Sequence, residues 1–179
     1  MDILAHSLWT NVVFYKKYAT EKRQRFLAVL FGILPDLVSF VPSTIYLFFH
    51  RQDFYSMTAE LGKAHGVFKY AIESYNYTHS MVIFVIVMVI VMIARKGRIY
   101  WPMWGWALHI VIDIFTHKDF FATPFLFPLS NYHFTHGTSW AHPVFMVVNY
   151  SALAVAYLAW FLVLRKKKSD PNNSGIYLK

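Results

Sequence analysis

Three residues within one apolar stretch have the types and the spacing of metal ligands. His109, Asp113 and His117 follow one another at intervals of four residues, which places them on one face of an α-helix. Imidazole and carboxylate groups on consecutive turns can share one ion, and the chain has no cysteine that could add a thiolate. Such a donor set suits Zn²⁺ best, with Mn²⁺ or Fe²⁺ as alternatives.

Other ionisable residues also interrupt apolar segments. A charged side chain in the middle of a bilayer costs about 2.5–3.5 kcal/mol, so each one needs a partner or a function. Counted at about 1.5 Å per residue from the cytoplasmic end of each segment, these residues reach a similar depth. Pro35 frees a backbone carbonyl and is expected to break its helix, which would aim Asp36 into the bundle. The predicted metal ligands are His6, Asp36, His79, His109, Asp113 and His117.

Further roles follow from this prediction. Asp36 or Asp113 is the expected proton acceptor in catalysis. Thr78, Thr116 and His136 are expected to contact a ligand or the substrate. His133 and His142 could bind a second metal, contact the substrate or lie at the membrane interface.

The elements that position these residues are predicted to be membrane helices. Of the 179 residues, 57% are hydrophobic and only 15% are charged, whereas soluble domains contain about 25% charged residues. We therefore expect an all-α membrane protein with a bundle of four transmembrane helices and a short N-terminal membrane helix. It would form one domain over residues 1–168, followed by a disordered tail at 169–179. The segments are 2–15, 26–49, 77–94, 100–117 and 143–164.

The basic residues predict how this bundle is oriented. The formal charge is +8, and thirteen of the 17 Lys and Arg lie in 16–25, 95–98 and 165–179. Positively charged loops stay in the cytoplasm, so the C-terminus would be cytoplasmic and the polar residues would face the outer half of the bilayer. The charge is thus explained without nucleic-acid binding. Loops 51–76 and 118–142 would face outward, the first as a surface helix and the second as an aromatic lid or interface belt.

The motifs also resemble a known family. His6, Leu34-Pro35-Asp36, Thr78-His79-Ser80, His109-x3-Asp113-x2-Thr116 and Phe127-Pro128 occur in this order. Over about residues 2–130 the chain resembles the bacterial inner-membrane metal-dependent hydrolases. The spacing is also similar to that of zinc-dependent phospholipase C enzymes, in which the last Asp can bridge two metals. Two departures are the sequence Leu37-Val38-Ser39 after Asp36 and the lack of an Arg before Thr78, for which Lys118, Lys69 or Arg51 could substitute.

The resemblance implies a hydrolase of the bacterial inner membrane. Its substrate would be a membrane lipid or a lipid-linked ester, with a phosphoester preferred, and a metal-activated water would attack it. Two alternatives use the same residues. A metal-ion or proton transporter also places His and Asp inside a membrane, and in a non-catalytic scaffold these residues would only form hydrogen bonds between helices.

Overall fold

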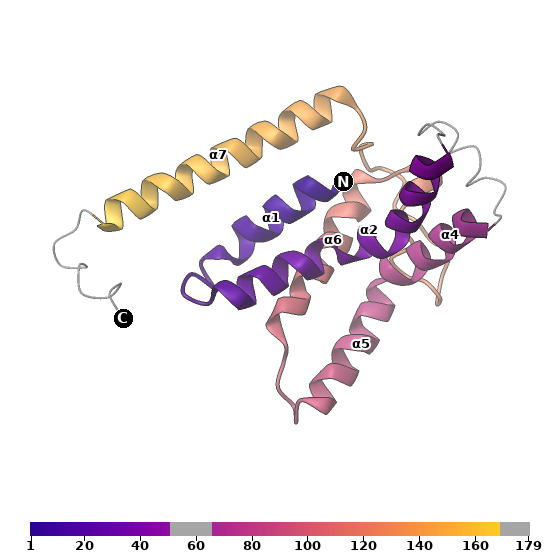
Figure 1. Ribbon diagram of the computed structural model, residues 1–179, viewed down its shortest axis with the longest axis horizontal. Coiled ribbons are helices and arrows are strands. Elements are labelled where there is room, and N and C mark those ends of the chain that lie inside the picture. Colours follow the sequence, from indigo (N-terminus) through magenta and orange to yellow (C-terminus); the bar gives the residue numbers. More distant parts are fainter. Residues whose placement is uncertain (51–65, 169–179) are drawn as a thin grey trace.

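All secondary structure in the described residues is helical. The structure is a computed structural model, and it describes residues 1–50 and 66–168. In these ranges it has six α-helices, two short 3-10 helices and no strand (Figure 1). The helices are α1 (Ile3–Tyr15), α2 (Lys22–His50), α4 (Gly66–Thr78), α5 (Met81–Ala94), η1 (Trp101–Met103), α6 (Trp104–Thr116), η2 (Asp119–Phe121) and α7 (Pro143–Lys168).

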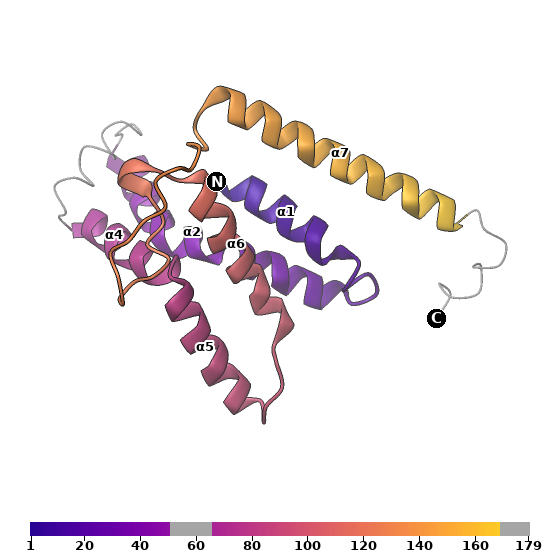
Figure 2. The same cartoon turned by 180° about the vertical axis from the view of Figure 1, so that it is seen from behind.

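Helix α2 lies at the centre, and α1, α4 and α6 pack against it (Figures 1 and 2). Two glycines allow α1 and α6 to approach α2 closely. A Cβ atom on Gly105 of α6 would lie 2.1 Å from the carbonyl oxygen of Ala28, and one on Gly32 of α2 would lie 2.3 Å from Thr10 Oγ1 of α1. Any larger residue at these positions would push the helices apart. The glycines therefore set the distances between the helices that carry the ionisable residues.

Helix α2 continues through two prolines, Pro35 and Pro42. Proline has no N–H to donate to the helix, which weakens it locally without ending it here. The expected break at Pro35 is therefore absent. Asp36 is directed inward by the face of α2 that it occupies, together with the buried residues Gly32 and Ser39.

Helices α4 and α5 are separated by a sharp bend of 66° at His79 and Ser80. The Ser80 hydroxyl caps α5 by accepting a hydrogen bond from the Ile83 N–H at 3.2 Å, and it donates one to the Phe127 carbonyl. The Met81 N–H donates to the Phe125 carbonyl at 2.9 Å. The prediction of one helix over 77–94 is therefore wrong at its start, because a tertiary contact with residues 125–127 anchors the bend.

Helix α6 ends one residue before His117. His109 and Asp113 lie on the helix, whereas His117 has an extended backbone with φ −116° and ψ 142°. Backbone N–H groups of the following loop donate to the end of α6, with Trp140 bonded to the Thr116 carbonyl at 2.9 Å. Of the three predicted ligands, His109 and Asp113 therefore share one face of α6, as predicted. His117 lies in the turn beyond the end of the helix.

Two helices are long and apolar enough to cross a membrane, namely α2 and residues 143–163 of α7. The bent pair α4 and α5 would make a third span if it crosses as one unit. Helix α6 has 13 residues, or about 20 Å at 1.5 Å per residue, against about 30 Å of hydrocarbon. The expected bundle of four transmembrane helices is therefore not confirmed, and neither is its orientation. The predicted surface helix, 51–76, is described only from residue 66, where α4 begins. The predicted tail, 169–179, lies outside the described residues.

Helix α7 runs beside α1 at the outside of the molecule (Figure 2). Polar contacts join the two helices. Trp9 Nε1 donates to Asn149 Oδ1 at 2.9 Å, and the Tyr150 hydroxyl donates to Asp2 Oδ1 at 2.8 Å. These bonds hold α1, which carries His6, in a fixed position.

Candidate metal centre

Four ionisable side chains from three parts of the chain meet inside the molecule. Asp36 comes from α2, His79 from the bend between α4 and α5, and His109 and Asp113 from α6. One ligand atom from each lies within 4.8 Å of the others. Asp36 is 5% exposed and the other three are fully buried. We call these four side chains, which could hold one metal ion, the metal cluster.

The distances within the metal cluster are those of a tetrahedron. His79 Nε2 lies 3.0 Å from His109 Nε2, 3.4 Å from Asp36 Oδ1 and 3.6 Å from Asp113 Oδ2. His109 Nε2 lies 3.7 Å from Asp36 Oδ1 and 3.1 Å from Asp113 Oδ2. Ligand atoms about 2.0–2.1 Å from a tetrahedral Zn²⁺ are about 3.3–3.4 Å from one another. Five of the six edges therefore fall around the separation that one ion requires.

Hydrogen bonds fix the tautomer of both histidines. His109 Nδ1 lies 2.8 Å from the Gly32 carbonyl, which can only accept, so Nδ1 carries the proton. The Thr78 hydroxyl donates its one hydrogen to the Ser74 carbonyl at 2.9 Å. His79 Nδ1, 2.9 Å from Thr78 Oγ1, must then donate to that oxygen. In the neutral form, both Nε2 atoms are left with a lone pair.

These two lone pairs face each other at the centre of the metal cluster. His79 Nε2 and His109 Nε2 would repel each other at 3.0 Å unless one of them binds a proton or both bind a metal ion. Asp113 Oδ2 is also buried there without a hydrogen-bond partner, and an unpaired buried carboxylate oxygen is costly. The donor set and the unpartnered oxygen both fit a bound metal ion. The Asp36, His79, His109 and Asp113 group could therefore hold one.

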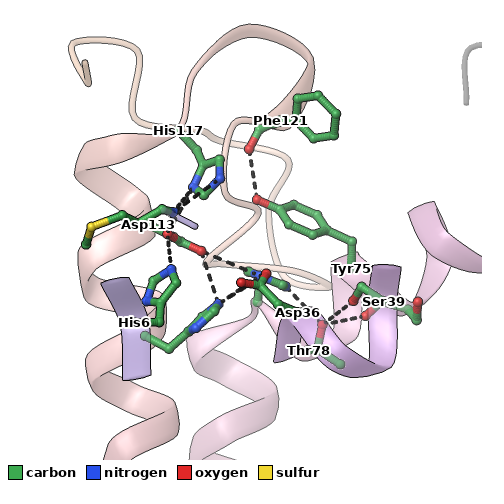
Figure 3. A network of polar contacts seen from close by, with 12 residues as sticks. His6, Asp36, Ser39, Tyr75, Thr78, Asp113, His117 and Phe121 are labelled. Atoms are coloured by element: carbon green, nitrogen blue, oxygen red, sulfur yellow. Dashed lines mark hydrogen bonds and ion pairs between the residues drawn. The ribbon is translucent and has the colours of Figure 1, made fainter. Parts of the chain in front are cut away.

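The second oxygen of Asp113 has a different set of neighbours. Asp113 Oδ1 contacts the Met1 amino group, and it lies 2.9 Å from His6 Nε2 and 3.0 Å from His117 Nδ1 (Figure 3). The Thr116 hydroxyl donates to the same oxygen at 3.3 Å. The His6 ring also stacks on His109 with 3.8 Å between centroids. His6 and His117 therefore contact the oxygen of Asp113 that the metal cluster does not use, and their predicted role as ligands would need a second ion at Oδ1.

The remaining predicted residues lie apart from the metal cluster or line its surroundings. His136 is exposed and bonds to its neighbour Thr135 at 3.4 Å, so the structure does not bring it to the cluster. His142 is also exposed. His133 lines a cavity next to the cluster. Lys69, a suggested replacement for the missing Arg, is 61% exposed.

Several residues that contact the metal cluster were not predicted. The Tyr75 ring stacks on His79 with 3.9 Å between centroids, and its hydroxyl donates to the Phe121 carbonyl at 2.8 Å. Ser39 Oγ lies 2.9 Å from Thr78 Oγ1 and must donate to it. Tyr75 precedes His79 by four residues, a helical spacing that could have revealed it. No pattern in the sequence indicates that the Gly32 carbonyl contacts the metal cluster.

No protein-family model, curated protein or solved structure matches this chain. The resemblance to inner-membrane hydrolases therefore stays a prediction from the motifs. The residues and the geometry of the metal cluster are the basis for inferring a function.

Proposed function

We propose that this chain is a membrane-embedded metal-dependent hydrolase that acts on a lipid or lipid-linked ester, with a phosphoester preferred. One observation supports this above the others. Four buried donors approach tetrahedral separations with two imidazole lone pairs directed at one another at 3.0 Å. Structural hydrogen bonds between helices would instead pair a donor with each acceptor.

Asp36, His79, His109 and Asp113 would hold the ion, and their two imidazoles and two carboxylates favour Zn²⁺. A divalent ion at such a site lowers the pKa of water towards about 7 and polarises a phosphoryl or acyl oxygen. Thr78 and the Gly32 carbonyl orient the two imidazoles through Nδ1. Such outer contacts keep ligand atoms directed at an ion.

Asp36 is the better candidate for the proton acceptor. Asp113 is fully buried, and the Met1 amino group, His6 and His117 already surround its Oδ1. Asp36 keeps 5% of its surface exposed, whereas the other three members of the metal cluster are fully buried, so the attacking water would enter on the side of Asp36. We propose that Asp36 takes the proton from the attacking water and that Asp113 is held as a fixed ligand.

A lipid substrate is supported by the surroundings of the site. Asp36 of the metal cluster lies on α2, which is long and apolar enough to cross a membrane. The 3-10 helix η2, which follows His117, presents Phe120 with 60% of its surface exposed. An apolar ester would be concentrated in such an environment, whereas a soluble charged substrate would not.

The test begins with the metal content of the purified full chain in detergent. We expect about one ion per chain in the wild type, the same in H136A, and a loss in H109A and D113A. His136 is the matched control because it is an exposed histidine away from the cluster. Unchanged metal content in both cluster variants would refute the metal site.

The second measurement separates the possible functions. Wild-type protein loaded with Zn²⁺, Mn²⁺ or Fe²⁺ is mixed with vesicles of phosphatidylglycerol, and the released products are quantified. Metal-dependent release that H109A abolishes supports the hydrolase. Metal flux into the vesicles without ester cleavage would overturn it in favour of a transporter, and a chain that binds no metal would point to a scaffold.

A further inference from the structure

A cavity of about 230 Å³ lies next to the metal cluster. Its walls come from α2, α4, η2 and the loop that follows. The lining includes Phe40, Ile72, Tyr75, Phe121, Ala122 and His133. Two of these segments, α2 and α4, also position Asp36 and His79.

The register of the helices makes the cavity an extension of the metal cluster. Phe40 follows Asp36 by four residues on α2, and Tyr75 precedes His79 by four residues on α4, so each lies one turn away on the same face. The Tyr75 ring lines the cavity and also stacks on His79 at 3.9 Å. This ring therefore belongs both to the lining of the cavity and to the surroundings of the cluster.

The chemistry of the lining selects an apolar ligand. Its side chains are mostly aromatic and aliphatic, and among the described lining residues none is charged. His133 Nδ1 is buried without a hydrogen-bond partner, and Asn76 also lines the cavity, so a polar group can be bound beside these two residues. A volume of about 230 Å³ holds roughly seven or eight groups the size of a water molecule. A short length of hydrocarbon chain fits these properties, whereas a free phosphate or a charged headgroup does not.

The geometry points to this cavity as the binding site for part of an acyl chain of the lipid substrate, whose scissile ester would lie at the neighbouring metal cluster. The inference rests on the proposed hydrolase function and names its substrate class. Tyr75 sets the position of the chain, because the bond from its hydroxyl to the Phe121 carbonyl at 2.8 Å ties the ring across the cavity. His133 forms a hydrogen bond with the polar group of the lipid that lies next to this acyl chain.

The test measures binding and not turnover. Full-length protein is placed in nanodiscs with phosphatidylglycerol that carries a diazirine near the seventh carbon of one acyl chain. After illumination, labelled peptides are identified by mass spectrometry. We expect labelling of the α4 peptide around Tyr75 in the wild type, and at least a fivefold decrease in A122F, where the new ring fills the cavity.

The matched control is A154F, the same substitution at an exposed position of α7. It should label like the wild type. I72W fills the cavity from the opposite wall and should repeat the effect of A122F. Equal metal content in A122F and A154F shows that the fold is kept. Labelling around Tyr75 that neither filling variant reduces would overturn the inference, as would wild-type labelling confined to the exposed faces of α5 and α7.

Lipid turnover in the same nanodiscs keeps the two proposals distinguishable. Cavity-dependent labelling without turnover would contradict the hydrolase and leave the acyl site standing. Turnover of the long-chain lipid that is equal in A122F and A154F would contradict the acyl site and leave the hydrolase standing.

Discussion

Thr78 is expected to control metal affinity without touching the metal. Its hydroxyl accepts the hydrogen bond from His79 Nδ1 at 2.9 Å and so leaves Nε2 directed into the metal cluster. T78V keeps the shape of the side chain and removes this acceptor. The His79 N–H would then be buried without a partner, because His79 has no exposed surface.

The size of the effect follows from that lost bond. A buried donor without a partner costs about 1–3 kcal/mol, and loss of an outer partner of a ligating histidine typically weakens metal binding by about 10–100-fold. The latter range corresponds to about 1.4–2.7 kcal/mol, so the two figures agree. We expect the Kd of T78V for Zn²⁺ to rise by about 10–100-fold.

The assay is competition with a chelating indicator of known affinity on the purified chain. T44V is the matched control, because Thr44 is an exposed threonine of α2 that bonds only to the Phe40 carbonyl at 2.8 Å. S39A should give a smaller rise than T78V, since it removes a donor to Thr78 and keeps the acceptor for His79. A T78V chain that binds Zn²⁺ as tightly as T44V would refute the assigned tautomer of His79.

Two further substitutions test the framework around the metal cluster. G105A should lower the free energy of unfolding by about 1–3 kcal/mol or more, because its Cβ would lie 2.1 Å from the Ala28 carbonyl oxygen; an unchanged denaturation midpoint would contradict the close packing of α2 and α6. S80A should cost about 1–3 kcal/mol, since it removes the cap of α5 and the bond to Phe127. S74A, which removes only hydrogen bonds from the hydroxyl to the Tyr70 and Ala71 carbonyls within α4, should have little effect, and equal midpoints for the two serine variants would show that the bend does not depend on Ser80.

The four residues of the metal cluster could be found without the structure. Asp36, His79, His109 and Asp113 are ionisable residues in strongly apolar segments, and the cost of burying them required a common explanation. Counting residues along each predicted helix was enough to suggest that they meet. Helical periodicity also placed His109 and Asp113 on one face, which α6 retains.

The arrangement around these residues could not be found in the same way. His117 lies beyond the end of α6 but contacts Asp113 Oδ1 at 3.0 Å, whereas His136, also predicted to act at the site, stays at the surface. Neither outcome follows from local spacing. The position of His117 depends on the loop that bonds to the end of α6, and His136 belongs to a segment without helical periodicity.

The sequence by itself determined an apolar, helical chain and the residues that are too polar for their surroundings, because hydrophobicity and helical period are local properties. Tertiary structure decided which atoms face the centre. The Gly32 carbonyl fixes the tautomer of His109, and contacts with Phe125 and Phe127 create the bend that presents His79. These contacts are made by backbone groups, which every residue carries, so no residue type in the sequence could indicate them. Only the packing of distant segments selects which backbone groups take part.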